Sequence, residues 1–303
     1  MIYTLTYNPS IDYLIYIDNL EVGTLNRSKR DAYFLGGKGV NVSQVLAQLG
    51  VESTALGFVA GFTGDEIERG LNEKGIRTDF VHLPQGHSRI NLKFTGQQET
   101  EVNAPGPLID TISMHLLHDT LKQIGPDDIL VLAGSVSADM GNDSFATLIA
   151  ALPYRDTKVV IDTTGESLLN SLAYHPFLIK PNLSELSDLF HEEFNASDRE
   201  PIADAAKKLQ LRGARNVLVS MGPDGAMLIC EDGSVLYREA PYGIVVNTVG
   251  SGDSMVAGFI AGYLRSKDLG TAFDLGISAG SATAFNEGLA DRDDIMQLYH
   301  LIS

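Results

Sequence analysis

Short apolar runs alternate with stretches of helical pattern along most of the chain. Residues 38–49 and 65–74 have the pattern of helices, and each stretch is followed by a glycine, Gly50 or Gly75, where a helix typically ends. The strand-like apolar runs between the helical stretches are residues 2–7, 54–59, 129–133, 159–162, 177–179 and 217–220. Strands that alternate with helices predict an α/β fold with a parallel sheet buried on both faces.

Two segments interrupt this alternation because they contain strand patterns with no helix between them. They span about residues 12–35 and 88–104, and Ile15 and Ile90 belong to their alternating apolar positions. We expect them to meet in a small, separate β-sheet that covers the open end of the main sheet as a lid. The alternative is an antiparallel extension of the main sheet's edge. No repeat, low-complexity tract or linker divides the chain, so residues 1–303 are expected to form one domain.

The charge balance excludes two classes of partner. The chain carries 39 acidic side chains against 22 lysines and arginines, which gives a formal net charge of −17. A protein this acidic lacks the field that holds a nucleic-acid backbone or an anionic membrane surface. Hydrophobic residues make up 44% of the chain and charged residues 20%, which is typical of a large folded core.

The cellular compartment is predicted from absences in the sequence. The single cysteine, Cys230, cannot form an internal disulfide or build a structural zinc site, and its apolar flanks predict a buried thiol. The N-terminus has no signal-peptide pattern, and no apolar stretch approaches the roughly 18 residues of a membrane-spanning helix. We therefore expect a soluble cytoplasmic protein.

The first candidate for chemistry is a glycine-rich loop that joins an extended segment to a helix, Gly36-Gly37-Lys38-Gly39-Val40-Asn41. Its glycines let a ligand approach the backbone, and the helix N-terminus offers N–H groups with partial positive charge. Lys38 adds a cation, and no Ser or Thr follows it, so the loop is not a Walker A motif. A plain turn before a helix is an equally good interpretation of this loop alone.

A second glycine-rich turn, residues 247–258, leads into another apolar helix. The N–H groups of Gly250, Ser251, Gly252 and Asp253 would face an anion at the helix N-terminus. A carboxylate there repels a phosphate unless it takes the proton from an attacking hydroxyl, so Asp253 is a candidate general base. The alternative is a simple helix cap, but a cap does not require glycine at both positions 250 and 252.

Further motifs are weaker when taken singly. Asn182 and Glu185, just after a strand, could hold water around Mg²⁺, although a capping box explains the same spacing better. Residues 220–226 fit a hairpin turn, along which a nucleotide could lie. The stretch from Gly276 to Gly280 fits the G-x-S-x-G pattern but lies inside a helical pattern, so we expect no nucleophile there. The basic side chains in or beside the lid and glycine loop are Arg27, Lys38 and Arg89.

Taken together, these motifs resemble the two signatures of the ribokinase-like (PfkB) sugar kinases, with matching order and separation. Residues 8–12, Asn182 with Glu185, and residues 220–226 match the family too, so the resemblance spans nearly the whole chain. It implies a three-layer α/β/α core with a mostly parallel sheet and a small β-sheet lid. Residues 88–93 and 99–107 look like the corresponding segments of the 1-phosphofructokinases within the family.

The resemblance implies a role for each matching position. Asp253 would be the catalytic base, and the anion hole would be formed with it by Gly250, Ser251 and Gly252. The sugar phosphate would be bound by Asp12, Gly36, Gly37, Lys38, Asn41, Arg89, Arg27, Asn103 and Ser137. The nucleotide would be bound by Lys180, Asn182, Ser220, Gly222, Gly225 and Asn286. Glu185 would hold the metal ion through water.

The implied activity is the ATP- and Mg²⁺-dependent conversion of fructose 1-phosphate to fructose 1,6-bisphosphate, by a homodimer that associates through the lid. The alternatives are a tagatose-6-phosphate kinase, a nucleoside kinase, which would not need Arg89, and a sugar-phosphate or nucleotide sensor without catalysis. A sensor gains nothing from a carboxylate that faces phosphate. Position 247 is Asn where ribokinase has an Asp linked to a monovalent cation, so a K⁺ requirement is not inferred.

Overall fold

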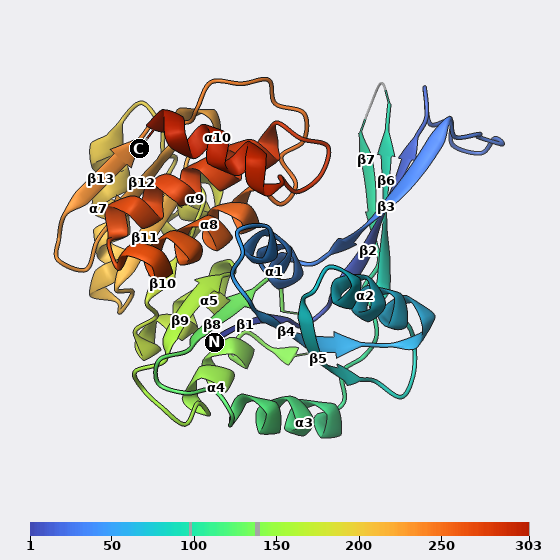
Figure 1. Ribbon diagram of the computed structural model, residues 1–303, viewed down its shortest axis with the longest axis horizontal. Helices are drawn as coiled ribbons and strands as arrows, with labels where there is room; N and C mark the ends of the chain where they lie inside the picture. The colour runs from blue at the N-terminus through green and yellow to red at the C-terminus, as the bar shows by residue number, and fades with distance from the viewer. Residues whose placement is uncertain (97–98, 137–139, 303) are drawn as a thin grey trace.

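The computed structural model describes residues 1–96, 99–136 and 140–302. Its main sheet has nine strands in the order β13-β12-β11-β10-β9-β8-β1-β4-β5, and all neighbours are parallel except the β11–β12 and β12–β13 pairs (Figure 1). The strands are β1 (Ile2–Thr6), β4 (Thr54–Val59), β5 (Arg77–His82), β8 (Ile129–Ala133), β9 (Lys158–Asp162), β10 (Leu178–Ile179), β11 (Asn216–Ser220), β12 (Ala226–Ile229) and β13 (Val235–Arg238).

A second sheet of four strands projects from one side of the core (Figure 1). Its order is β3-β2-β6-β7, with bounds β3 (Arg30–Gly36), β2 (Ser10–Tyr16), β6 (Arg89–Thr95) and β7 (Thr100–Asn103). The two segments that interrupt the strand–helix alternation therefore form a separate sheet, as predicted, and not an extension of the main sheet. We call this sheet the lid.

Helices cover both faces of the main sheet and bury it. One face packs against α3 (Thr111–Leu121), α4 (Ser144–Ala150), α5 (Gly165–Ser171), α6 (Leu183–Phe190) and α7 (Arg199–Leu211). The other face packs against α1 (Lys38–Gln48), α2 (Gly61–Glu73), α8 (Ser251–Ser266), α9 (Leu269–Ala284) and α10 (Arg292–Ile302). The predicted three-layer core is confirmed. None of the described helices has the length and apolar character needed to cross a membrane.

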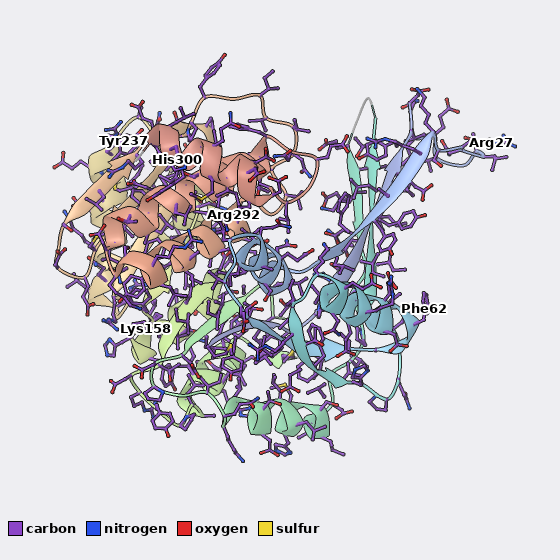
Figure 2. The ribbon with its side chains drawn as sticks, viewed as in Figure 1. Arg27, Phe62, Lys158, Tyr237, Arg292 and His300 are labelled. Carbon is purple, nitrogen blue, oxygen red and sulfur yellow. The ribbon has the colours of Figure 1, made fainter. Side chains whose placement is uncertain are left out.

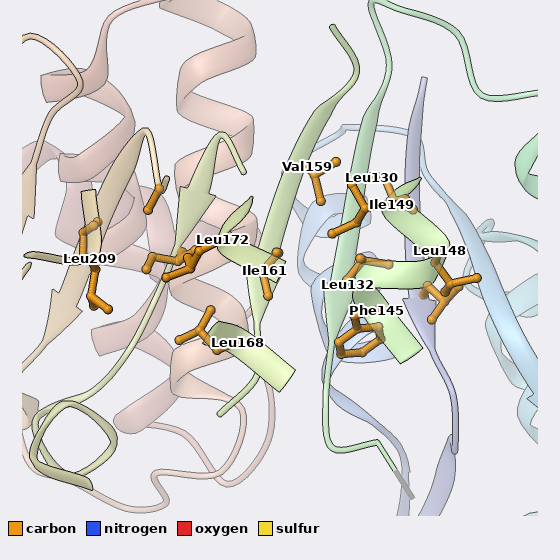
Figure 3. Close-up of a cluster of buried hydrophobic side chains, with 14 of the residues drawn as sticks. Leu130, Leu132, Phe145, Leu148, Ile149, Val159, Ile161, Leu168, Leu172 and Leu209 are labelled. Carbon is orange, nitrogen blue, oxygen red and sulfur yellow. The ribbon is translucent and has the colours of Figure 1, made fainter. Parts of the chain in front are cut away.

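The core explains why the central strands read as continuous apolar runs. Side chains at alternate positions of β8 and β9 enter opposite helix layers, so Leu130 and Leu132 meet one layer while Val131 meets the other. Figure 3 shows part of the first cluster, where strand residues pack against Phe145 of α4 and Leu168 of α5. A strand that is buried on both faces has no polar positions to expose.

The parallel direction of these strands brings their carboxyl ends to one edge. Ala133 at the end of β8 lies opposite Asp162 at the end of β9. Lys180 directly follows β10, and Ser220 is the last residue of β11. Ligands of open α/β sheets bind outside this edge. The lid begins directly after β1, so its base lies over the same edge.

Close contact between α8 and α9 depends on small residues. Gly276 and Gly280 lie within α9, and a Cβ at either position would come 3.0 Å from a backbone oxygen of α8. The hydroxyl of Ser278 donates to the carbonyl oxygen of Asp274 inside the same helix. The G-x-S-x-G pattern is thus a packing motif, as the sequence interpretation favoured.

We expect Gly258→Ala to destabilise the protein, although alanine in a helix interior is normally favoured by about 1 kcal/mol. The added Cβ would lie 2.5 Å from the carbonyl oxygen of Leu275 and 2.8 Å from the Cβ of Ala279. Such overpacking costs on the order of 2 kcal/mol, which thermal denaturation followed by circular dichroism would detect as a lower Tm. The matched control is Gly70→Ala in α2, whose Cβ would meet the flexible end of Leu35, and Tm there should be unchanged or slightly raised. Equal Tm values for both variants would contradict this close packing.

Candidate active site at the carboxyl edge of the sheet

A cavity of about 470 Å³ lies between the base of the lid and the carboxyl edge of the main sheet. It brings together residues that the sequence analysis singled out from distant segments. Those that line it are Asp12, Gly37, Lys38, Asn41, Arg89, Lys180, Asn182, Glu185, Ser220, Gly250, Gly252 and Asp253. Cooperation of these segments in one site is therefore consistent with the geometry.

The first glycine loop turns directly into α1 at the cavity. Gly37 has φ 111°, which a residue with a side chain rarely adopts, and an added Cβ would lie 2.8 Å from Cγ2 of Thr6. Gly36 is equally restricted, since its Cβ would lie 2.7 Å from Oδ2 of Asp12. The loop thus lies tight against β1 and the lid base, and this contact places Lys38 and Asn41 at the cavity.

The second glycine loop forms the N-terminus of α8. Gly250 is the N-cap residue, with φ 81°, and no side chain caps this helix end. Within the described residues the N–H groups of Gly250, Gly252 and Asp253 donate to no other group, whereas the N–H of Ser251 donates to the carbonyl oxygen of Thr248 at 3.2 Å. Three backbone donors therefore remain for an anion.

The Asp253 carboxylate is not used as a helix cap. Its Oδ2 accepts a hydrogen bond of 2.8 Å from Nδ2 of Asn41, and the side chain is buried. Burial, followed by repulsion from Asp162, raises the pKa of Asp253 to about 6, although Lys38 and Asn41 oppose this rise. The group is therefore ionised at neutral pH but more basic than an ordinary aspartate, as a general base requires.

Asp162 is a central residue of the site that the sequence analysis did not identify. Its side chain is 1% exposed, and its Oδ1 lies 3.1 Å from Nζ of Lys38 and 3.5 Å from Nζ of Lys180. Burial alone would raise the pKa of Asp162, but attraction to the two ammonium groups outweighs it and lowers this pKa. Conversely, the carboxylates around Lys38 raise the pKa of that lysine despite its burial. The only signal in the sequence is an acidic residue at the end of an apolar strand.

Asn182 and Glu185 form the capping box of α6, as their spacing suggested. Asn182 Oδ1 accepts from the Glu185 N–H, and Glu185 Oε2 accepts from the Asn182 N–H, each at 2.8 Å. Glu185 Oε1 takes no part in the capping box. Asp162 Oδ2 is buried and has no hydrogen-bond partner among the described residues. Among the residues that the structure describes, no group of three or more His, Cys, Asp or Glu side chains gathers as a direct metal site. Such oxygens would suit Mg²⁺ held through its own water shell.

The lid contributes Asp12 and Arg89. Asp12 Oδ1 accepts hydrogen bonds from Ser10 Oγ at 2.9 Å and from Asn91 Nδ2 at 2.8 Å. Arg89 donates to the carbonyl oxygen of Asn8, and burial lowers the pKa of its guanidinium. Arg89 also lines an adjoining cavity of about 330 Å³. A guanidinium that lines both cavities and can form two parallel hydrogen bonds is suited to an anionic substituent of a ligand.

Several predicted residues are not brought to the cavity lining. Arg27 is exposed at the outer end of the lid, in the loop between β2 and β3 (Figure 2). Asn103, at the end of β7, is exposed on the lid. Asn286 donates to Ala282 and Asp294 at the end of α9. The lining also omits the hairpin residues Gly222 and Gly225. Ser137 lies outside the described residues.

Comparisons with known proteins agree with this geometry. A family model described as "pfkB family carbohydrate kinase" matches residues 5–295. The 1-phosphofructokinase of Bacillus subtilis (strain 168) is 41% identical over 298 residues, which cover 98% of this chain and 97% of that protein. The D-tagatose-1-phosphate kinase of Bacillus licheniformis is 38% identical and covers 96% of this chain and 95% of that protein.

A solved structure shows the same arrangement in three dimensions. Phosphofructokinase-2 from Escherichia coli in complex with substrates and products matches with a TM-score of 0.91 and 27% identity, and the match covers 99% of each chain. The resemblance seen in the two glycine-rich signatures is thereby confirmed over nearly the full length. The chain belongs to the pfkB family of carbohydrate kinases.

Proposed function

We propose that this kinase transfers the γ-phosphoryl group of ATP to the 6-hydroxyl of fructose 1-phosphate, which yields fructose 1,6-bisphosphate. One observation carries the proposal. The buried Asp253 carboxylate does not cap α8, and it lies beside backbone N–H groups at the start of this helix that have no acceptor among the described residues. Similarity to the Bacillus subtilis 1-phosphofructokinase along 98% of the chain supports the choice of sugar.

The residues at the start of α8 can perform the transfer. A bond forms between the sugar O6 and the γ-phosphorus, and the bond from that phosphorus to the bridging oxygen breaks, so ADP leaves. The hydroxyl proton passes to Asp253, whose pKa of about 6 leaves it ionised at neutral pH. The N–H groups of Gly250, Gly252 and Asp253 would face the charge on the transferring group. The ammonium group of Lys180 lies close to the same loop, since a Cβ added at Gly252 would be 3.0 Å from Lys180 Nζ.

The two ends of the cavity suit the two substrates. At the lid base Asp12, Lys38 and Asn41 would hold the sugar, and Arg89 would bind its 1-phosphate. The nucleotide would lie along Lys180, Asn182 and Ser220 and continue towards Gly222, Gly225 and Asn286, as the family resemblance implies. When bound, Mg²⁺ would neutralise nucleotide phosphate charge, and Glu185 would hold it through water.

The alternative substrate is another ketose phosphate. A tagatose-6-phosphate kinase would use the same base and anion hole, and one relative is named for D-tagatose 1-phosphate. A sensor without catalysis is disfavoured because a pure binding site gains nothing from the Asp253 carboxylate, whose pKa of about 6 leaves it ionised, and therefore repulsive to phosphate, at neutral pH. Fructose 1-phosphate remains the preferred assignment.

A homodimer that forms through the lid is part of the proposal. The lid and the loop between its strands β2 and β3 expose large apolar side chains, among them Val102 in β7 at 54% and Leu25 in the loop at 78% exposure. A thin sheet with uncovered apolar positions is typical of a surface that a second copy covers. Arg27 lies at the lid's outer end, so it would serve a site only through such an assembly. Because ATP is a cytoplasmic metabolite, we also expect a cytoplasmic enzyme.

We expect Asp253→Asn to lower kcat by about 100- to 10,000-fold, the usual contribution of a general base. In the unmodified enzyme, kcat/KM should rise with pH through about 6, as the Asp253 carboxyl loses its proton. Steady-state ADP release measured from pH 5 to 9 tests both statements. A variant that folds and keeps near-normal turnover would show that Asp253 is not the base.

The same variant has a stability signature that is independent of turnover. The pKa of Asp253 is higher in the folded protein, about 6, than its ordinary 3.8, so the ionised group destabilises the fold once pH rises through this range. An uncharged Asn removes that cost, and the free energy of unfolding should increase by on the order of 2 kcal/mol at pH 8 and by less at pH 5. Chemical denaturation at both pH values measures the difference.

We expect Arg89→Ala to raise KM for fructose 1-phosphate at least about 10-fold while KM for ATP changes little, because a charge-assisted phosphate contact is lost. A coupled assay with fructose 1-phosphate, tagatose 1-phosphate, tagatose 6-phosphate and fructose 6-phosphate measures this and ranks the substrates. The control is Arg212→Ala, on α7's exposed C-terminal side. A higher kcat/KM for another sugar phosphate would overturn the assigned substrate. An equal rise in KM for Arg89→Ala and Arg212→Ala would show that Arg89 does not bind the sugar phosphate.

We expect the protein to have twice the chain mass of 32.7 kDa in solution, measured by light scattering coupled to size exclusion. The double variant Leu25→Asp/Val102→Asp places charges on the lid and should shift the mass towards the monomer. Leu211→Asp is the matched control, since this leucine at the end of α7 is 89% exposed on the core. A wild-type monomer, or a dimer that persists in the double variant, would contradict association through the lid.

A further inference from the structure

Asn91 lies beside Asp12 at the base of the lid. Strands β2 and β6 pair in parallel, with Asp12 directly opposite Asn91 (Figure 1). Both residues line the 470 Å³ cavity, and Asn91 is 6% exposed. Its Nδ2 donates to Asp12 Oδ1 at 2.8 Å, while its Oδ1 is buried with no hydrogen-bond partner among the described residues.

The orientation of the Asn91 amide follows from its neighbour. An ionised carboxylate only accepts hydrogen bonds, so the group that faces Asp12 must be the NH₂ of the amide. The reverse orientation would place two oxygens within hydrogen-bond distance of each other. The Asn91 oxygen is therefore turned away from Asp12 and needs a donor from elsewhere.

Asp12 itself presents one free oxygen beside this amide. Its Oδ1 already accepts from Ser10 and Asn91, whereas its Oδ2 lies 4.0 Å from Nζ of Lys93, beyond hydrogen-bond distance. The neighbouring residue Gly36 leaves this oxygen uncovered because it has no side chain, and a Cβ there would lie only 2.7 Å from Asp12 Oδ2. Asp12 Oδ2 and Asn91 Oδ1 are thus two acceptors without a hydrogen-bond donor among the described residues, on two side chains that both line the cavity.

A buried acceptor without a donor costs about 1–3 kcal/mol, so its retention in a site points to a donor that arrives with the ligand. The phosphoryl oxygens of both substrates accept hydrogen bonds and cannot satisfy it. Ring hydroxyl groups can donate, and a ketose phosphate carries adjacent ones. Asp12 and Asn91 match such a pair of adjacent donors.

We propose that Asn91 is a specificity-determining residue that accepts a hydrogen bond from the ring hydroxyl next to the one bound by Asp12. The inference rests on the proposed function and deepens it. Because two fixed acceptors on adjacent strands test the relative orientation of two adjacent hydroxyls, this pair distinguishes ketose phosphates that differ in configuration at one ring carbon. Fructose 1-phosphate and tagatose 1-phosphate differ in this way.

The test is a cycle that combines a side-chain change with removal of a substrate hydroxyl. The kcat/KM values of wild type and Asn91→Ala are measured with fructose 1-phosphate and with its 3-deoxy and 4-deoxy analogues. We expect Asn91→Ala to reduce kcat/KM for fructose 1-phosphate by about 10- to 100-fold, with KM for ATP unchanged. With one of the two deoxy analogues the reduction should fall below about threefold, since the hydroxyl that Asn91 binds is then absent.

Ser10→Ala is the matched control for a purely positional role. It removes the other hydrogen bond to Asp12 Oδ1 and leaves the Asn91 oxygen in place. We expect it to lower kcat/KM by the same factor for the sugar and both analogues. If Asn91→Ala behaves likewise, Asn91 acts only by holding Asp12, and the inference is overturned; no loss at all overturns it too.

Folding and substrate identity are tested separately. Should Asn91→Ala not fold, Asn91→Ser is used, and calorimetric binding of the deoxy analogues to the wild type must still show one hydroxyl whose loss weakens binding about 10-fold or more. Equal binding of all three sugars would contradict the inference. A wild type that phosphorylates a different sugar overturns the proposed substrate alone, and the cycle then decides on Asn91 with the deoxy analogues of that sugar.

Discussion

The buried ion pairs of Asp162 with Lys38 and Lys180 hold the two halves of the active site together. A carboxylate that is 1% exposed is costly unless it is paired, and both of its partners come from distant parts of the chain. Lys38 starts α1, directly after lid strand β3, and Lys180 follows β10, at the end of the cavity where the nucleotide is proposed to lie. The pairing therefore fixes a lysine from each end of the cavity on one carboxylate. The same negative charge helps to keep the proton affinity of Asp253 high enough for a base.

The site resolves an electrostatic conflict that the net charge poses. Both substrates are anions, yet the chain has a net charge of −17, and the cavity lining has three basic against four acidic side chains. Local basic side chains alone therefore do not make the cavity attractive for phosphate, contrary to the simplest expectation from Lys38 and Arg89. The remaining attraction must come from the backbone donors at the start of α8 and from a bound cation. Backbone donors suit this task because they carry no acid–base equilibrium of their own.

The parts of the site that were predictable from sequence are those with a local backbone requirement. Gly37 and Gly250 adopt positive φ at helix starts, and such turns leave a glycine pattern that can be read without the fold. Asp162 leaves no pattern, because one aspartate at the end of an apolar strand becomes important only when the strand order brings two lysines to it. Arg27 and Arg89 look alike in sequence, but only the pairing of β6 with β2 places Arg89 at the cavity. The layered core was predictable since its strands are apolar on both faces.

In the proposed function, the catalytic base and the sugar-binding residues of the lid lie on different elements of the fold. The proposed base and anion hole lie at the start of α8 in the core, where α1 also carries Lys38 and Asn41, whereas Asp12, Arg89 and Asn91 belong to the lid. Parallel pairing of β2 and β6 sets these three side chains in one register, so a movement of the lid carries them together. Sugar binding can then draw the lid onto the core and expel water before the phosphoryl group becomes reactive. Substrate preference could change through lid residues without disturbing Asp253, because Asp253 is held by helix α8 of the core and the lid residues by a separate sheet.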